Sequence, residues 1–189
     1  VALRFIHSDL GFQVDDDGYS KGNAVAADIA FYYKKPVSVA GAKADLMVGL
    51  NITNIGTKIT YDNGVTNEYL PANLRLGVGF WYEIDNYNKI GATVDFNKLL
   101  VPTPDYRNTD DDEAMYEKRQ KYYDKSVIAS IFSSFTDAPR GGKEELEEID
   151  VCGGIEYTYN NMFSARVGYH NNPENKGNLK YASAGLSIA

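Results

Sequence analysis

The sequence predicts an all-β fold, an antiparallel transmembrane β-barrel of about eight strands with one long, partly helical extracellular loop. Three observations predict this fold. Apolar and polar residues alternate in segments of about 9–13 residues, and a tilted strand needs about 9–11 residues to cross a bilayer. Short connections tend to alternate with long ones, as they do in outer-membrane barrels. Tyrosine, which suits membrane–water interfaces, occurs 15 times among the 189 residues.

The composition narrows the class of protein. The net charge of −7 argues against a nucleic-acid binder, which normally carries a basic patch. The single cysteine, Cys152, excludes an intramolecular disulfide and is expected to act as a small, partly buried hydrophobic residue. A mean hydropathy of −0.39 is compatible with a membrane barrel, because only every second residue of a strand faces lipid.

Eight segments alternate with a period of two. They are Val1–Phe12, Asn23–Lys34, Ala44–Ile55, Ala72–Glu83, Lys89–Leu100, Glu148–Asn160, Phe163–His170 and Lys180–Ile188. In the fourth segment, for example, Leu76, Val78 and Phe80 share one face and Arg75 and Trp81 lie on the other. A soluble lipocalin-like barrel shows the same alternation with its apolar face inward, so alternation alone leaves that alternative open.

The connections favour the membrane barrel. Ile84–Asn88 and Asn161–Met162 are short, and Lys35–Lys43 is intermediate. The long connections are Gln13–Gly22, Gly56–Pro71, Val101–Glu147 and Asn171–Asn178. Four aromatic residues lie on the apolar face beside the short-turn ends, where an interfacial girdle is expected: Tyr33, Tyr82, Tyr159 and Phe163.

The longest connection is predicted to contain structure of its own. Asp110 and Glu113 have the spacing of a capping box that opens a helix through Tyr123. Val127–Phe135 is a second candidate helix, after which the segment 137–142 interrupts the regular structure. We therefore expect residues 1–189 to be one barrel domain and residues 101–147 to be an extracellular loop insertion.

Signals for an enzyme are weak. His7 and His170 lack metal-ligand spacing, and neither a nucleophile elbow nor a phosphate-binding loop is present. We expect no catalytic residue, metal or cofactor. Charged residues inside the strands are expected to face the lumen, because a lipid-facing charge at the bilayer midplane costs about 2–4 kcal/mol. This candidate lumen network consists of Arg4, Asp28, Arg75, Asp95, Glu156 and Arg166.

Several ordered segments resemble the PorV family, FadL-like outer-membrane barrels of the type IX secretion system in Bacteroidota. They are residues 51–59, 69–74, 95–104, 131–139 with 144–146, and 165–169. The resemblance runs from about Ser20 to the end of the chain. It implies a barrel of fourteen strands, of which these eight are an internal to C-terminal part, so that the chain is truncated at both ends. It also implies a location in the bacterial outer membrane.

The resemblance implies protein secretion rather than catalysis. Its expected partners are the C-terminal signal domains of secreted cargo proteins, the translocon barrel, the surface sortase complex and outer-membrane lipid, with no nucleic acid. The candidate partner-facing loop comprises Leu100, Val101, Pro102, Thr103, Pro104, Phe132, Phe135, Thr136, Asp137 and Pro139. The alternatives are a FadL-type transporter of hydrophobic compounds and an outer-membrane lipid A deacylase, for which His170 has no assignable serine partner.

Overall fold

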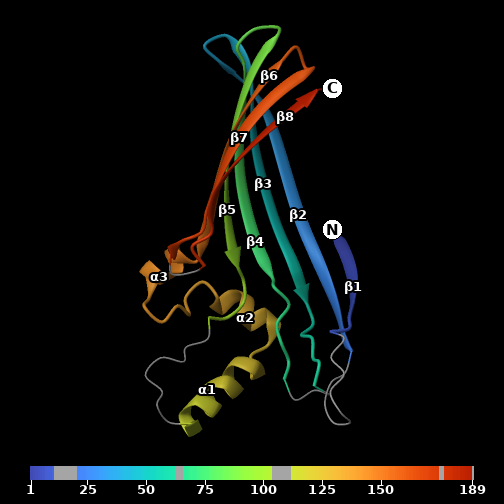
Figure 1. The fold of residues 1–189 in the computed structure, drawn as a ribbon, viewed down its shortest axis with the longest axis vertical. Helices are drawn as coiled ribbons and strands as arrows, with labels where there is room; N and C mark the ends of the chain where they lie inside the picture. Colours follow the sequence, from blue (N-terminus) through green and yellow to red (C-terminus); the bar gives the residue numbers. More distant parts are fainter. Residues whose placement is uncertain (11–20, 63–65, 104–111, 175–176, 189) are drawn as a thin grey trace. The chain divides into compact units, whose positions relative to one another are not determined.

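The computed structural model describes residues 1–10, 21–62, 66–103, 112–174 and 177–188 (Figure 1). Eight strands form one sheet in which each strand neighbours the next in chain order. Pairing is antiparallel for β1–β2, β5–β6, β6–β7 and β7–β8. The strands are β1 (Ala2–Ser8), β2 (Gly22–Val39), β3 (Ala42–Gly56), β4 (Asn73–Glu83), β5 (Asn88–Leu99), β6 (Ile149–Tyr159), β7 (Phe163–Asn171) and β8 (Lys180–Ile188). The predicted all-β, barrel-type antiparallel fold is confirmed.

Each of the eight predicted segments contains one strand. The prediction that residues 35–43 form a connection of intermediate length is wrong. β2 continues to Val39 and β3 begins at Ala42, which leaves the two-residue turn Ala40–Gly41. Both turn residues have positive φ, 51° and 82°, as a type I′ hairpin requires. The turn matches the twist of the paired strands, so the ladder extends further than hydrophobic alternation alone indicates.

The strand register defines two faces of the sheet. Gly91, Glu156, Arg166 and Gly185 lie opposite one another in one row across β5–β8. Two residues along, Thr93, Gly154, Gly168 and Ser183 form the next row. We call this side of β5–β8 the polar face and the side that carries Ile155 and Val167 the apolar face, because successive strand residues point to opposite sides.

The large residues of the apolar face are exposed. Ile155 is 53% exposed, Val167 59% and Leu186 74%. The buried apolar residues of the strands are instead small, such as Ala24, Ala26 and Ala44. A lipocalin-like soluble barrel would bury its large apolar side chains inside, so the described strands do not have the packing that this alternative needs. Among the described residues, no helix has the length and apolar character needed to cross a membrane.

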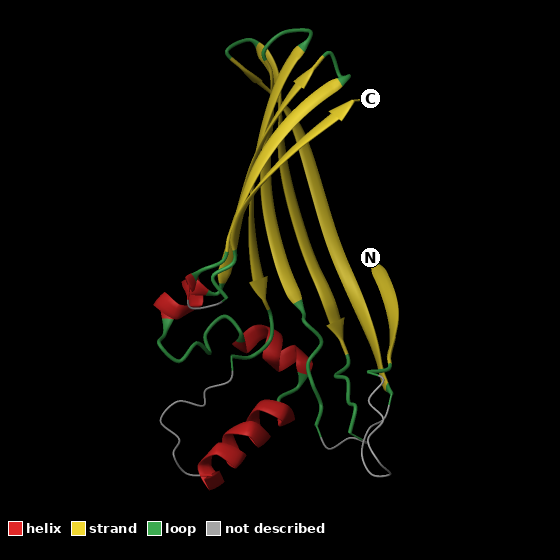
Figure 2. Ribbon diagram, in the orientation of Figure 1, coloured by secondary structure: helices red, strands yellow, loops and turns green. Residues whose placement is uncertain are grey.

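The chain divides into two compact units. The first comprises Val1–Ile29, Ile52–Asn73 and Leu99–Leu146 and includes two predicted helices, α1 (Asp112–Asp124) and α2 (Val127–Ser133). Figure 2 shows the helices in red. Asp110, the expected cap of α1, lies outside the described residues. A third helix, α3 (Gly142–Glu147), was not predicted. Its residues Glu144 and Glu145 accept the backbone N–H groups of Arg140 and Ala138, respectively.

The second unit comprises Ala30–Asn51, Leu74–Lys98 and Glu147–Ala189 and contains the three short turns. In the β4–β5 turn, the Asp85 carboxylate accepts the backbone N–H groups of Tyr87 and Asn88 at 2.8 Å. These bonds favour the ionised carboxylate and lower the pKa of Asp85, with the bond to Tyr87 the largest cause. In the β6–β7 turn, Asn160 and Asn161 have positive φ, a conformation that asparagine tolerates better than most residues.

Candidate functional site

The predicted lumen residues include two ion pairs between neighbouring strands. In the first unit, Arg4 Nη2 on β1 lies 2.5 Å from Asp28 Oδ1 on β2. Asn54 on β3 joins this pair, since its backbone N–H donates to Asp28 Oδ1 and its side-chain oxygen accepts from Arg4 Nη2 at 2.6 Å. Asn54 has a φ of 59°, and its Nδ2 donates to the Pro71 carbonyl. The network therefore links three strands, and Asn54 is a member that was not predicted from the sequence.

The second ion pair joins Glu156 on β6 to Arg166 on β7. Arg166 Nε lies 3.0 Å from Glu156 Oε2, and these residues are opposite one another in the register. Arg166 also donates to Ser187 Oγ at 3.0 Å, while Thr158 Oγ1 donates to Glu156 at 3.2 Å. The opposite charges are thus balanced within the polar face.

Arg75 and Asp95 lie on the neighbouring strands β4 and β5. Asp95 lies directly against Gly77, where a Cβ atom would come within 2.2 Å of the carboxylate oxygen. This close approach explains why a glycine occupies that position on β4. Asp95 is also the register partner of Cys152 on β6, so the charged residue and the thiol share one row of the sheet.

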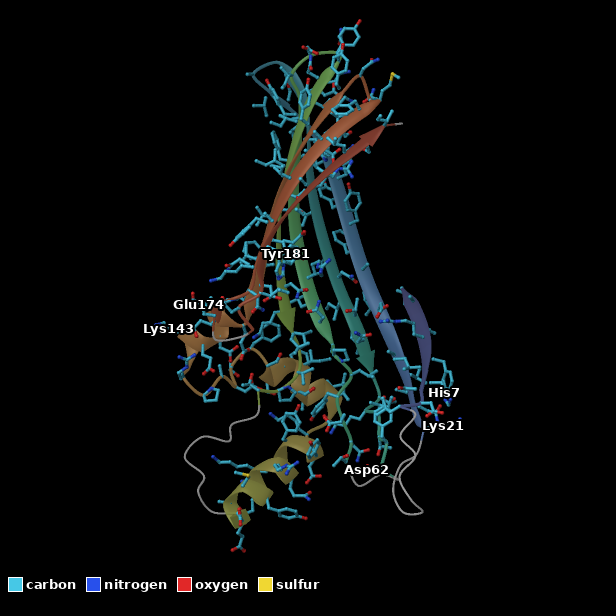
Figure 3. All side chains as sticks on the ribbon, viewed as in Figure 1. His7, Lys21, Asp62, Lys143, Glu174 and Tyr181 are labelled. Atoms are coloured by element: carbon cyan, nitrogen blue, oxygen red, sulfur yellow. The ribbon has the colours of Figure 1, made fainter. Side chains whose placement is uncertain are left out.

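His170 has partners other than a serine hydroxyl in the described structure. Its Nδ1 lies 3.0 Å from Cys152 Sγ, and its ring stacks on Tyr181 of β8 with centroids 4.9 Å apart. Figure 3 labels Tyr181. The deacylase alternative needs a serine–histidine pair, and these contacts do not supply one. Among the described residues, no group of three or more His, Cys, Asp or Glu side chains could hold a metal ion.

The first half of the predicted partner-facing loop is largely buried. Leu100 is 2% exposed, and its backbone N–H donates to the Ala72 carbonyl at 2.7 Å. Pro102 is also buried, Val101 and Thr103 are half-buried, and Pro104 lies outside the described residues. The Thr103 N–H donates to Asp137 Oδ2 at 3.3 Å, which ties this segment to the second half of the loop.

The second half of the loop presents apolar side chains to solvent. On α2, Phe132 is 73% exposed and Ile128 59%, and their spacing of four residues places them on one side of the helix. Phe135 and Thr136, just after α2, are exposed, whereas Asp137 and Pro139 are half-buried. We call Ile128, Phe132 and Phe135 the α2 apolar surface.

The burial of α2 is the reverse of that in an ordinary amphipathic helix. Its buried residue is Ser130, and Ser134 at the C-cap is buried as well. Their hydroxyls donate to the carbonyls of Val127 and Ile131, so the buried polar groups are satisfied within the helix itself. The serines pack inward and Val127 and Ile131 are half-buried, whereas Ile128 and Phe132 remain exposed. Exposed large apolar side chains that lie together are typical of a surface that binds another molecule.

A second feature that sequence reasoning missed holds the end of α1 in place. The Tyr69 hydroxyl lies 2.9 Å from the Tyr122 carbonyl and 2.6 Å from the Lys125 carbonyl. Lys58 Nζ donates to the Tyr123 carbonyl and lies 4.3 Å from the centroid of the Tyr69 ring. We call Lys58 and Tyr69 the α1 anchor. Together they satisfy carbonyls that a helix leaves without internal partners at its C-terminus.

The pKa values of both residues of the α1 anchor are shifted by their surroundings. Burial raises the pKa of Tyr69 to about 12, with a smaller contribution from the charge of Asp124. Burial also lowers the pKa of Lys58, partly offset by Asp124 and Glu68. A cation near a helix C-terminus interacts favourably with the helix dipole, which is the role that Lys58 can perform here.

Comparison with known protein families shows to which family the chain belongs. The family model described as type IX secretion system protein PorV matches residues 1–106, which is more than half of the 189 residues. The chain belongs to the PorV family. No curated protein matches the chain.

The PorV match includes three of the segments on which the resemblance rests, residues 51–59, 69–74 and 95–104. It begins at residue 1, earlier than the expected start near Ser20. The two residues of the α1 anchor and the Arg4–Asp28 pair lie within the matched region. The later segments, at 131–139 and 165–169, lie beyond the match and remain a prediction.

Proposed function

We propose that this PorV-family chain acts in the bacterial outer membrane as a binding component of the type IX secretion system. Its strands would cross the bilayer, and residues 101–147 would form an extracellular loop insertion. The exposed apolar face of the strands supports the membrane location, because large apolar side chains in lipid need no protein cover. The charged pairs Arg4–Asp28 and Glu156–Arg166 would then face the lumen.

The observation that carries the binding role is the α2 apolar surface. An ordered helix with buried serines and exposed Ile128 and Phe132 has its large apolar side chains available to a partner. We propose that this surface binds the C-terminal signal domains of secreted cargo. The translocon barrel and the surface sortase complex would associate with the same outer side of the protein. The buried residues Leu100 and Pro102 would support the loop rather than contact the partner.

The test compares a double variant in α2 with a control variant in α1. Phe132→Ser, combined with Ile128→Ser, removes the apolar surface of α2. Tyr116→Ser is the matched control, because Tyr116 is also an exposed aromatic residue, 64% exposed, on α1. Binding of a purified signal domain to the detergent-solubilised protein is measured by surface plasmon resonance.

We expect the double variant to weaken binding at least about tenfold, since each truncated hot-spot residue typically costs about 1–2 kcal/mol or more. The control should stay within about twofold of the unaltered protein. Unchanged binding by the double variant, with the control equally unaffected, would exclude the α2 apolar surface as the cargo site. Recovery of the chain from cells in the soluble periplasmic fraction would contradict the outer-membrane role.

A further inference from the structure

The polar face of β5–β8 contains a hollow with a glycine floor. The hollow has a volume of about 310 Å³, and Gly154 and Gly168 pair with each other in its floor. Thr93 and Ser183 flank this pair in the same row. A Cβ atom built at Gly154 would meet its nearest neighbours, Thr93 Oγ1 and the Val167 carbonyl, only at 3.5 Å. The space above Gly154 therefore accepts additional atoms without displacing the backbone.

An aromatic wall borders the hollow. Trp81 is one of its lining residues, and the indole lies so close to Gly91 that a Cβ there would come within 2.7 Å of the ring. Packing of an aromatic ring over a strand glycine is a recurring way to cover exposed backbone. The Gly154–Gly168 pair has no such ring among the atoms nearest to a Cβ at either position. Gly91 is thus covered by Trp81, whereas the space above Gly154 in the adjacent row is open.

The charges around the hollow are balanced. Glu156 and Arg166 both line it and form an ion pair at 3.0 Å. A ligand that lies beside this pair therefore needs no net charge of its own. The guanidinium donates hydrogen bonds, the carboxylate accepts them, and the hydroxyls of Thr93 and Ser183 can do both. Such a set is complementary to a ligand that carries several hydroxyl groups, each of which also donates and accepts.

From this chemistry we propose that the hollow binds a neutral mono- or disaccharide. The C–H face of a sugar ring is apolar and flat enough to lie over the glycine floor beside Trp81, while its hydroxyls reach Glu156, Arg166, Thr93 and Ser183. The volume of about 310 Å³ is at the lower end of the range for small-molecule sites, about 300–1,000 Å³, and suits one or two rings. This site is separate from the α2 apolar surface, so either proposal can fail without the other.

Trp81 provides a direct probe, because it is the only tryptophan in the 189 residues. The full chain, purified in a zwitterionic detergent without a sugar headgroup, is titrated with glucose, galactose, N-acetylglucosamine and maltose. We expect at least one of these sugars to give a saturable change in tryptophan emission with a millimolar dissociation constant. Glucuronate, which adds a negative charge, should bind more weakly than glucose. Absence of a saturable response to all four neutral sugars would overturn the proposal.

Two neighbouring glycines give matched variants. Gly154→Leu fills the hollow, whereas Gly153→Leu places the same side chain on the opposite face, where the nearest atom to a Cβ is the Thr93 carbonyl oxygen at 3.8 Å. The first variant should weaken sugar binding at least about tenfold and the second less than about twofold. Equal losses in both would contradict the assignment of the site.

Two further measurements keep the proposal testable if Gly154→Leu fails to fold. Thr93→Val removes one hydroxyl with little change in shape and should weaken binding several-fold, so an unchanged affinity would count against the site. Titration with palmitate distinguishes the ligand class. A saturable response of Trp81 emission to palmitate, without any response to sugars, would show an apolar ligand and refute the saccharide.

Discussion

The α1 anchor leads to a quantitative prediction about Tyr69→Phe. The replacement keeps the aromatic ring, which lies 4.3 Å from Lys58 Nζ and 5.3 Å from the ring of Tyr122, and removes only the hydroxyl. That hydroxyl has one proton, shared between the carbonyls of Tyr122 and Lys125 at 2.9 Å and 2.6 Å. The loss is therefore one partly buried neutral hydrogen bond, or about 1–2 kcal/mol.

The effect should be local because α1 depends on its surroundings. The helix has 13 residues and no buried side chain, and isolated helices of about 12–15 residues are marginal in water. We expect Tyr69→Phe to accelerate hydrogen exchange of the α1 amides about 5- to 30-fold, as that energy range implies. Amides of β6 and β7 should keep their protection. Hydrogen–deuterium exchange with mass spectrometry resolves the two regions.

Tyr116→Phe is the matched control on the same helix. The Tyr116 hydroxyl accepts a hydrogen bond from Gln120 Nε2 at 2.9 Å on the exposed surface, so its loss should change exchange less than about twofold. Unaltered α1 exchange in Tyr69→Phe, or equal acceleration in both variants, would refute the role of the α1 anchor.

The pH dependence follows from the raised pKa of Tyr69. A tyrosine in the unfolded chain ionises near its ordinary pKa of 10.0, whereas Tyr69 in the folded chain ionises with a pKa of about 12. The folded state therefore holds the proton more tightly, so the stabilisation from Tyr69 is complete below pH 10 and is lost as the pH rises towards 12. Tyrosinate absorbance should show a late-titrating component that is lost in Tyr69→Phe. An identical titration in the variant would contradict this assignment.

Two further predictions concern packing and charge. Lys98 and Glu148 form a pair at 2.7 Å with side chains only 7% and 11% exposed, so Lys98→Met should cost about 3–5 kcal/mol by leaving Glu148 buried without this cation. Denaturant unfolding checks this, and full stability in the variant would contradict it; Lys98→Met with Glu148→Leu should recover most of the loss. A Cβ at Gly56 would come within 2.2 Å of the Val25 carbonyl oxygen, whereas one at Gly49 meets nothing within 4 Å. Gly56→Ala should therefore destabilise by at least about 2 kcal/mol and Gly49→Ala by less than about 1 kcal/mol, measured in the same way, and equal effects would show that the backbone at Gly56 can move.

The local sequence predicts the strands well because alternation is a local property. Each predicted segment contains a strand, and the ends of most agree closely, as with β8 at Lys180–Ile188. The largest error is at β2, where the strand continues through Lys35 to Val39. Alternation fades there, and the conformation of the Ala40–Gly41 turn determines how far the strands stay paired.

The candidate site was only partly predictable. Strand-interior charges could be assigned to one face, and two of their ion pairs, Arg4–Asp28 and Glu156–Arg166, are present. The acidic residues between 144 and 148 include Glu144, which is only 8% exposed and accepts the Arg140 N–H group. Composition cannot distinguish a solvated carboxylate from one that caps a backbone turn, because the difference depends on the path of the chain.

By itself, the sequence determined the strand pattern, the side of each strand that carries charge, the presence of two helices between residues 110 and 135, and the resemblance to PorV. These properties follow from the period of two or 3.6 residues and from short-range capping, which are local. Only the tertiary structure decided that α2 buries its serines and exposes Phe132, and that Lys58 and Tyr69 hold the end of α1. Alternation of apolar and polar residues is visible in the sequence itself. The contact between Tyr69 and Lys125 joins residues 56 positions apart, so it forms only when the chain folds.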